Sequence, residues 1–110
     1  MVKYIPEQGD IVWLEFDPQA GHEQSGKRPA IVISHRIYNE KTGLALFCPV
    51  TTSIKGYPFE VKLPSIMKTT GVVLSDQIKS LDWIIRKAKF IEKVPRATLT
   101  EVITKFSKLY

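Results

Sequence analysis

The sequence is poor in the residues that build disulfide, zinc and membrane structures. It contains one cysteine, Cys48, and two histidines among 110 residues. One cysteine cannot form an intramolecular disulfide, so a reducing cytoplasm is the expected compartment. The cysteine and the two histidines cannot supply four zinc ligands. Neither a metal nor a cofactor is expected. No apolar run reaches the length of a signal peptide or membrane span. Linkers, repeats and low-complexity segments are also missing, which predicts a single domain over residues 1–110.

Basic charge is present but unevenly distributed. Sixteen Lys and Arg residues against eleven Asp and Glu residues give a formal net charge of +5. Residues 1–83 hold nine of each sign, so residues 84–110, with seven basic and two acidic side chains, supply the whole excess. A basic end of this kind fits a polyanion or an acidic protein partner, and equally a solvated surface.

Short β-branched and aromatic runs predict a mainly β protein with a C-terminal α-helix. Strands are expected at 11–16, 29–34, 44–50, 59–63, 71–74 and 83–90, and a helical turn capped by Ser34 within 35–42. Near the end, Thr98 and Glu101 fit a capping box, and the apolar residues that follow recur at helical spacing: Leu99, Val102, Ile103, Phe106 and Leu109. This order of elements favours a small antiparallel barrel with one helix packed on the sheet.

Three polar segments lie between the apolar strands, at residues 23–29, 49–57 and 75–80. Their arginine, hydroxyl, amide and lysine groups suit a phosphodiester ligand. The Arg28 guanidinium can recognise two phosphate oxygens at once, hydroxyls complete an anion cradle, and lysines follow a nucleic-acid backbone. Taken singly, the same residues also serve as surface ion pairs or turn formers. His22 and His35 are not expected to be essential, and Cys48 is expected to be a packed thiol.

The whole chain resembles the MazF/PemK-like toxins of bacterial toxin–antitoxin pairs. The resemblance rests on six motifs in order: Gly9-Asp10-Ile11-Val12-Trp13, Phe16-Asp17-Pro18, residues 21–30, Cys48-Pro49-Val50-Thr51-Thr52, residues 55–61 and residues 75–82. It implies a PemK-like, SH3-related barrel and a homodimer with an RNA groove at the subunit interface. The implied activity is metal-independent, sequence-specific cleavage of single-stranded mRNA, which inhibits translation and is neutralised by an acidic, MazE-like antitoxin.

The resemblance also assigns roles to residues of the three polar segments. Arg28 and Thr51 match the family's catalytic arginine and threonine, and Glu23 is its loop acid, a base or an orienting group for Arg28. The expected RNA-binding residues are Gln24, Lys27, Thr52, Ser53, Lys55, Gln77 and Lys79. Residues 65–70 look slightly longer than in near relatives, a difference that bears on base recognition.

Cleavage without a metal implies attack by the RNA's own 2′-hydroxyl on the adjacent phosphorus, leaving a 2′,3′-cyclic phosphate and a 5′-hydroxyl. Two other classes stay open from the sequence: a non-catalytic RNA-binding barrel and a gyrase poison of the CcdB type, which shares the fold. Arg28 and Thr51 favour the nuclease over both. The gyrase poison further requires an apolar aromatic tail, whereas this sequence ends Lys108-Leu109-Tyr110.

Overall fold

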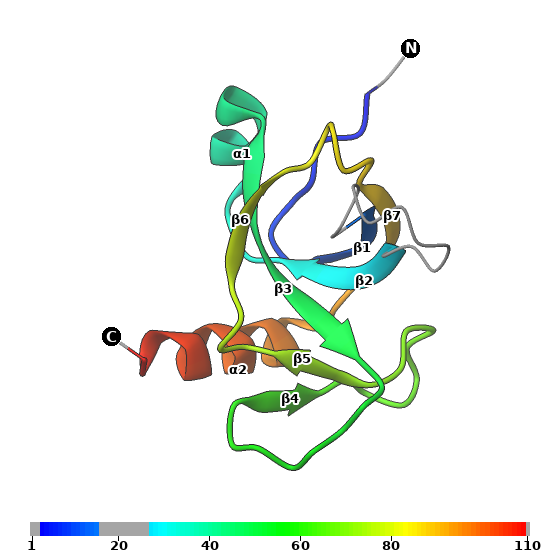
Figure 1. Cartoon of the computed structure of the whole chain (residues 1–110), viewed down its shortest axis with the longest axis vertical. Coiled ribbons are helices and arrows are strands. Elements are labelled where there is room, and N and C mark those ends of the chain that lie inside the picture. The colour runs from blue at the N-terminus through cyan, green and yellow to red at the C-terminus, as the bar shows by residue number, and fades with distance from the viewer. Residues whose placement is uncertain (1–2, 16–26, 110) are drawn as a thin grey trace.

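Seven strands and two helices form the described part of the chain, residues 3–15 and 27–109 of a computed structural model (Figure 1). In chain order they are β1 (Asp10–Glu15), β2 (Lys27–Val32), α1 (Arg36–Thr42), β3 (Leu44–Thr51), β4 (Glu60–Lys62), β5 (Val72–Leu74), β6 (Lys79–Asp82), β7 (Lys89–Lys93) and α2 (Arg96–Ser107). Neither helix combines the length and apolar character needed to cross a membrane.

The strands pair antiparallel in the order β4-β5-β3-β2-β1-β7, and β6 joins β3 beside this path. β3 is the centre of the sheet: its middle pairs with β2, its first half with β6, and its end, at Val50 and Thr51, with β5. The predicted mainly β fold with a C-terminal helix is therefore confirmed. Among the described strands, however, β4 and β7 do not pair, so the sheet is open and not a fully closed barrel.

Neighbouring residues of a strand point to opposite faces of the sheet, and each face carries a cluster of buried apolar residues. Ile11 and Ile31 belong to a core cluster that α2 covers through the buried Val102 and the flanking Leu99. The other face carries a second cluster, which contains Val12, Leu14, Ala30, Val32, Ala45, Phe47 and Trp83. Two apolar faces explain why residues 29–33, which include most of β2, read as an uninterrupted apolar run.

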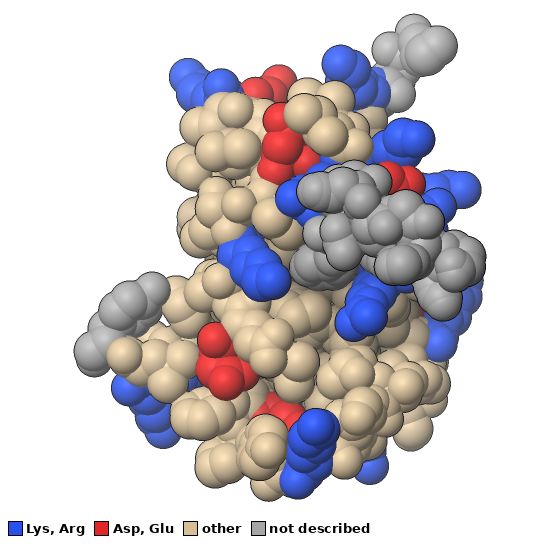
Figure 2. Space-filling view, in the orientation of Figure 1, with Lys and Arg blue, Asp and Glu red and all other residues tan. Residues whose placement is uncertain are grey.

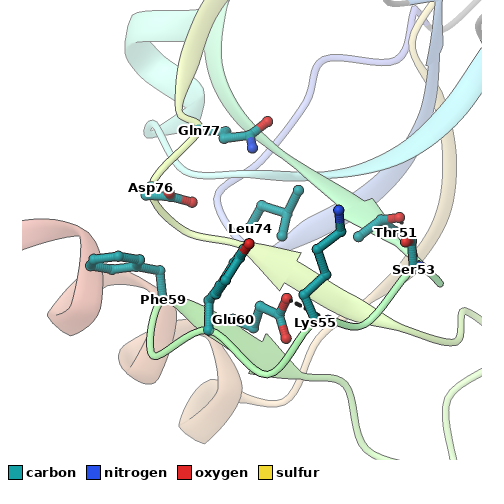
Figure 3. A pocket seen from close by; sticks show the side chains of 9 residues that line it. Thr51, Ser53, Lys55, Phe59, Glu60, Leu74, Asp76 and Gln77 are labelled. Atoms are coloured by element: carbon teal, nitrogen blue, oxygen red, sulfur yellow. Dashed lines mark hydrogen bonds between the residues drawn. The ribbon is translucent and has the colours of Figure 1, made fainter.

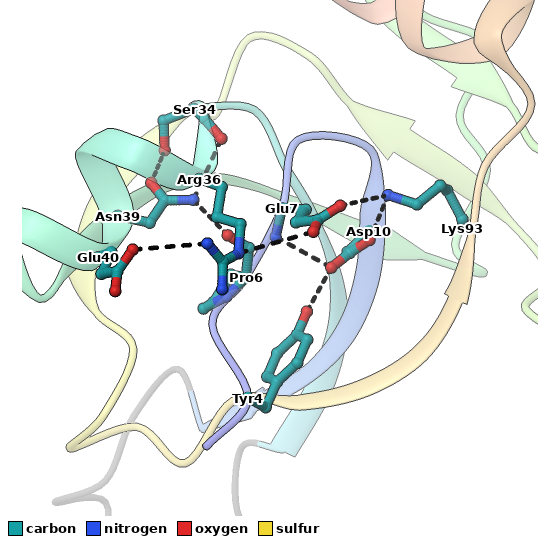
Figure 4. A network of polar contacts seen from close by, with 9 residues as sticks. All are labelled: Tyr4, Pro6, Glu7, Asp10, Ser34, Arg36, Asn39, Glu40 and Lys93. Carbon is teal, nitrogen blue, oxygen red and sulfur yellow. Dashed lines mark hydrogen bonds and ion pairs between the residues drawn. The ribbon is translucent and has the colours of Figure 1, made fainter. Parts of the chain in front are cut away.

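A buried polar network ties the N-terminal segment to this sheet (Figure 4). The Asp10 carboxylate accepts hydrogen bonds from the Tyr4 hydroxyl at 2.6 Å and the Glu7 amide at 3.0 Å, and pairs with Lys93 Nζ at 2.7 Å. Partial burial alone would lower the pKa of Lys93, but Asp10 and Glu7 raise it above its ordinary value. The fully buried Asn39 also donates to the Pro6 carbonyl.

Three local predictions are wrong. The first concerns the capping box at Thr98. Helix α2 begins earlier, at Arg96, where the amides of Thr98 and Leu99 both donate to the Pro95 carbonyl. Thr98 is buried in the first turn, and no side chain caps the helix. The preorganised φ of proline accounts for the earlier start.

Ser34 does not cap α1 either. His35 occupies the N-cap position, and the Ser34 hydroxyl donates to Asn39 Oδ1 and accepts from the Leu46 amide. The predicted strand at 83–90 is mostly a turn, since the Asp82 carboxylate accepts the amides of Ile84 and Ile85 at 2.9 Å and stops β6 there. Its apolar residues satisfied a strand pattern, but a local side-chain acceptor decided the backbone.

Candidate active site

The predicted catalytic residues Arg28 and Thr51 lie on the neighbouring strands β2 and β3. Arg28 is exposed near the start of β2, and Thr51 is the partly buried last residue of β3. The paired register of these strands ends at Ala30 opposite Pro49. Beyond this pair, Val50 and Thr51 pair with β5. The fold thus places Arg28 and Thr51, which are 23 positions apart in the sequence, near adjacent ends of neighbouring strands.

Local contacts orient Thr51. Its hydroxyl oxygen accepts a hydrogen bond of 3.0 Å from the Ser53 amide, so its own proton remains available for donation to a ligand. On the other side of the backbone lies Gly71, with a φ of +118°. A Cβ at Gly71 would overlap the Thr51 carbonyl oxygen and carbon, so only glycine permits this approach.

A surface pocket of about 260 Å³ opens beside Thr51 (Figure 3). Its lining residues are Thr51, Ser53, Lys55, Tyr57, Phe59, Glu60, Leu74, Asp76 and Gln77. Figure 3 shows Asp76 and Gln77 on one side, Thr51 and Ser53 on the other, and Leu74 between them. We call this the Thr51 pocket. It unites two of the three polar segments singled out in the sequence.

The loop that carries Lys55 is held by Glu60. The Glu60 carboxylate accepts the amides of Lys55 and Gly56, each at 3.0 Å, and Gly56 turns the chain with a φ of +80°. The fully buried Ser75 donates a hydrogen bond from its hydroxyl to the Phe59 carbonyl, and so links the segment of Phe59 to that of Asp76. These bonds preform the pocket, which limits the ordering cost of binding a ligand.

Five lining residues were not predicted to be catalytic or RNA-binding, although Tyr57 and Asp76 lie in the polar segments 49–57 and 75–80: Tyr57, Phe59, Glu60, Leu74 and Asp76. The aromatic pair, Tyr57 and Phe59, lies in the motif of residues 55–61, but neither side chain was assigned a role. Asp76 is the most relevant omission, because no hydrogen bond or ion pair within the described residues engages its exposed carboxylate.

Burial, assisted by the negative charge of Asp76, raises the pKa of the Cys48 thiol to about 12. The expectation of a packed, inert Cys48 is confirmed by its full burial.

The other predicted site residues are not in the Thr51 pocket. Thr52 lines a separate pocket described below, while the exposed Lys27 and Lys79 begin β2 and β6. Glu23 and Gln24 lie outside the described residues. Figure 2 shows basic side chains gathered on the side of the molecule where β2 and β7 lie, which suits an anionic ligand. Within residues 3–15 and 27–109, no three His, Cys, Asp or Glu side chains are grouped to hold a metal ion.

An oriented threonine hydroxyl and Lys55 at the Thr51 pocket, with Arg28 outside its lining at the neighbouring strand end, suit a phosphodiester ligand. The class of protein is a small antiparallel sheet with a terminal helix. Comparison with known families gives its membership. Residues 7–110 match the model of the PemK-like, MazF-like toxins of type II toxin–antitoxin systems. The chain belongs to this family.

Individual relatives agree with this assignment. The endoribonuclease toxin MazF of Escherichia coli K12 is 52% identical over 86 residues, which cover 78% of this chain and 77% of the relative. A crystal structure of MazF from Deinococcus radiodurans superposes with a TM-score of 0.89 at 51% identity and 97% coverage of both chains. A MazE–MazF crystal structure from the same organism gives 0.90 at 49% identity, covering 96% of each chain.

Proposed function

We propose that this toxin cleaves single-stranded RNA, chiefly mRNA, at specific sequences and so inhibits translation, with Arg28 and Thr51 as its catalytic pair. The chain is an endoribonuclease toxin: relatives named endoribonucleases are 36% and 52% identical to it. One observation supports the residue assignment, namely that Arg28 and Thr51 lie near the adjacent ends of the paired strands β2 and β3, with Thr51 lining the Thr51 pocket.

These two side chains suit a reaction in which the RNA supplies its own nucleophile. The 2′-hydroxyl oxygen bonds to the adjacent phosphorus, the bond to the 5′-oxygen breaks, and the products carry a 2′,3′-cyclic phosphate and a 5′-hydroxyl. The protein must take a proton from the nucleophile, stabilise charge on the phosphoryl oxygens and protonate the leaving oxygen. Arg28 stabilises the charge and can deliver the leaving-group proton, while the Thr51 hydroxyl donates to a phosphoryl oxygen.

Two carboxylates are candidates for the base. Glu23, the acid that the resemblance indicates, is proposed either as the base or as a group that orients Arg28. Asp76 shares the Thr51 pocket and has no partner within the described residues, so it can also accept the proton of the 2′-hydroxyl. Comparing Glu23→Gln with Asp76→Asn separates them, because loss of the base removes the acidic limb of the pH–rate profile.

The remaining polar residues are proposed to hold the strand. Lys27 and Lys55 contact the RNA backbone, and the bases are read by Gln24, Thr52, Ser53, Gln77 and Lys79. Single-stranded RNA fits this role because its unstacked bases can be read on their edges. The Thr51 pocket, with Gln77 and Ser53 facing one another across it, supports the assignment.

The proposal extends to partners and location. The active form is a homodimer with the RNA groove at its subunit interface, and the toxin acts in the cytoplasm, where mRNA is translated. A cognate acidic, MazE-like antitoxin neutralises it. The likeness to the toxin chain in MazE–MazF crystal structures from Deinococcus radiodurans supports this partner, as does the basic excess of residues 84–110.

The chemistry is tested with a defined single-stranded RNA in excess EDTA. We expect cleavage to persist, because the 2′-hydroxyl and Arg28 require no divalent ion, and the products to carry cyclic phosphate and 5′-hydroxyl ends. A single 2′-deoxy nucleotide on the 5′ side of the cut is expected to block cleavage while binding persists. Activity that is lost in EDTA and restored by a divalent ion, or normal cutting of the deoxy substrate, would contradict the mechanism.

A further inference from the structure

Trp13 is an exposed aromatic side chain on an otherwise buried strand. It lies in β1 between the fully buried Val12 and Leu14, yet 39% of its surface is accessible to solvent. The other tryptophan, Trp83, is 6% exposed and donates its indole N–H to the Asn39 carbonyl at 2.9 Å. Within the described residues the Trp13 indole has no hydrogen-bond partner. No polar contact within residues 3–15 and 27–109 therefore accounts for the position of the Trp13 indole.

Trp13 lines a second surface pocket, of about 400 Å³, which we call the Trp13 pocket. Its lining residues are Trp13, Pro29, Thr52, Lys68, Thr69, Thr70 and Ile91. Strand register places Trp13 opposite Pro29 on β2 and opposite Lys89 on β7, so these three side chains share one face of the sheet. An aromatic and apolar wall thus faces a polar, cationic wall.

The polar wall is built before any ligand arrives. The Glu92 carboxylate accepts the amides of Lys68 at 3.2 Å and Thr69 at 2.7 Å, and also the Thr69 hydroxyl at 2.8 Å. Thr69 is thereby buried and committed to Glu92, whereas Lys68 and the hydroxyl of Thr70 remain exposed. Lys68, Thr69 and Thr70, the end of the 65–70 segment whose length was expected to bear on base recognition, form this wall.

The Trp13 pocket lies near the proposed catalytic pair but on the other face of the sheet, because Trp13 pairs with Pro29 whereas Arg28 pairs with Leu14. Pro29 follows Arg28 in the chain, and Thr52 follows Thr51. Thr51 lines the Thr51 pocket while Thr52 lines the Trp13 pocket, so the end of β3 separates the two. A strand of RNA with its reacting phosphate at Arg28 and Thr51 can therefore reach both pockets by passing over the strand ends that separate them.

We propose that the Trp13 pocket binds one base of the RNA substrate, stacked on the Trp13 indole, with the neighbouring phosphate near Lys68 and Lys89. The inference rests on the proposed function and adds a specificity subsite to it. Stacking suits an exposed indole because every base presents a π face, and the free hydroxyls of Thr52 and Thr70 can meet base edges. The two lysines favour a phosphate over an uncharged ligand.

The test measures RNA binding by intrinsic fluorescence, using RNA with a 2′-deoxy nucleotide at the cut. Because Trp83 is buried, we expect RNA to change chiefly the emission of Trp13, and this response to be lost in Trp13→Phe. Trp13→Ala is expected to weaken RNA binding about tenfold to hundredfold, as is usual for a lost base–aromatic stack, and to raise KM more than it lowers kcat. Tyr38→Ala, which removes a similarly exposed aromatic on α1, is the matched control and should bind normally.

The stacked base is identified with RNAs that carry one abasic nucleotide at each position in turn. In the wild type, one abasic position should cost about as much affinity as Trp13→Ala, and in that variant the same position should cost little more. Equal losses of affinity in both proteins at every abasic position would overturn the proposal. Unchanged RNA binding by a folded Trp13→Ala would also overturn it, even if that variant bound an acidic antitoxin peptide less well. Failure of the wild type to cleave RNA would instead contradict the proposed function.

Discussion

Arg28 and Thr51 are the residues on which the proposed chemistry depends most. Both are at least partly accessible, so neither is required to fill the core. The bond from the Ser53 amide to the Thr51 hydroxyl fixes the direction of that hydroxyl before substrate arrives. Such preorganised donors stabilise a transition state because they need no rearrangement when charge develops.

Removing either group should therefore affect turnover and leave the fold intact. We expect Arg28→Ala and Thr51→Ala each to lower kcat about a hundredfold or more, with an unchanged midpoint of thermal unfolding. Thr51→Ser keeps the donor and should retain most activity, and Arg96→Ala removes an exposed arginine at the start of α2 as a control. Turnover of either alanine variant near that of the wild type, measured on the same RNA, would show that the assignment is wrong.

At the scale of elements, the end of β3 and the start of β5 form the support for the site. Gly71 has a backbone conformation that L side chains rarely adopt and lies against the Thr51 carbonyl. The amide of Leu63 donates to the Gly71 carbonyl at 3.0 Å, which holds this approach in place. The position of Thr51 thus depends on the absence of one side chain in the neighbouring strand.

Gly71→Ala is expected to impair both stability and catalysis. The new methyl group must displace the Thr51 backbone, so kcat should fall at least tenfold, and the free energy of unfolding should fall by more than the ~1–2 kcal/mol cost of a left-handed residue. Gly43→Ala is the matched control, since Gly43 has a φ of +74° at the end of α1 but no atom closer than 4.0 Å to its Cβ. Urea unfolding and single-turnover cleavage measure both effects; equal turnover of the two variants would contradict a supporting role for Gly71.

At the scale of the whole molecule, the positive charge and the two pockets are expected to make RNA and antitoxin compete for the same surface. Residues 84–110 carry the entire excess of positive charge, and the proposed site adds Arg28, Lys55 and Lys68. An acidic segment that occupies the same groove is the simplest inhibitor of such a nuclease. It would fold on contact and meet the same cations as the RNA backbone.

We therefore expect an acidic antitoxin peptide and a non-cleavable RNA to compete for the toxin. Stopped-flow measurements should show association of the peptide slowing as salt rises, because long-range attraction steers the encounter. Lys55→Gln should slow association and raise the Kd, whereas Lys41→Gln, on α1, should change it little. Simultaneous binding of both ligands in one groove, or an association rate that is independent of salt, would exclude this mode of inhibition.

What the sequence by itself determined is the kind of elements and the chemistry available to them. The apolar runs predicted β1, β2, β3, β4 and β5, and the helical spacing of Val102 and its neighbours predicted α2, because strand and helix periods follow directly from backbone geometry. The resemblance supplied Arg28 and Thr51. The ends of elements were less well predicted. Local hydrogen bonds to the Pro95 carbonyl and the Asp82 carboxylate set the start of α2 and the end of β6, and the hydrophobic pattern does not show them.

Only the tertiary structure decided which groups meet. The open sheet, the approach of Gly71 to Thr51 and the placing of Asp76 in the Thr51 pocket all depend on strand pairing between distant segments. Trp13 shows the reason most clearly. Its position in an apolar strand predicts burial, yet Trp13 is 39% exposed on the face that it shares with Pro29 and Lys89. A strand pattern specifies alternating faces, but the neighbouring strands and loops decide whether a given face is covered.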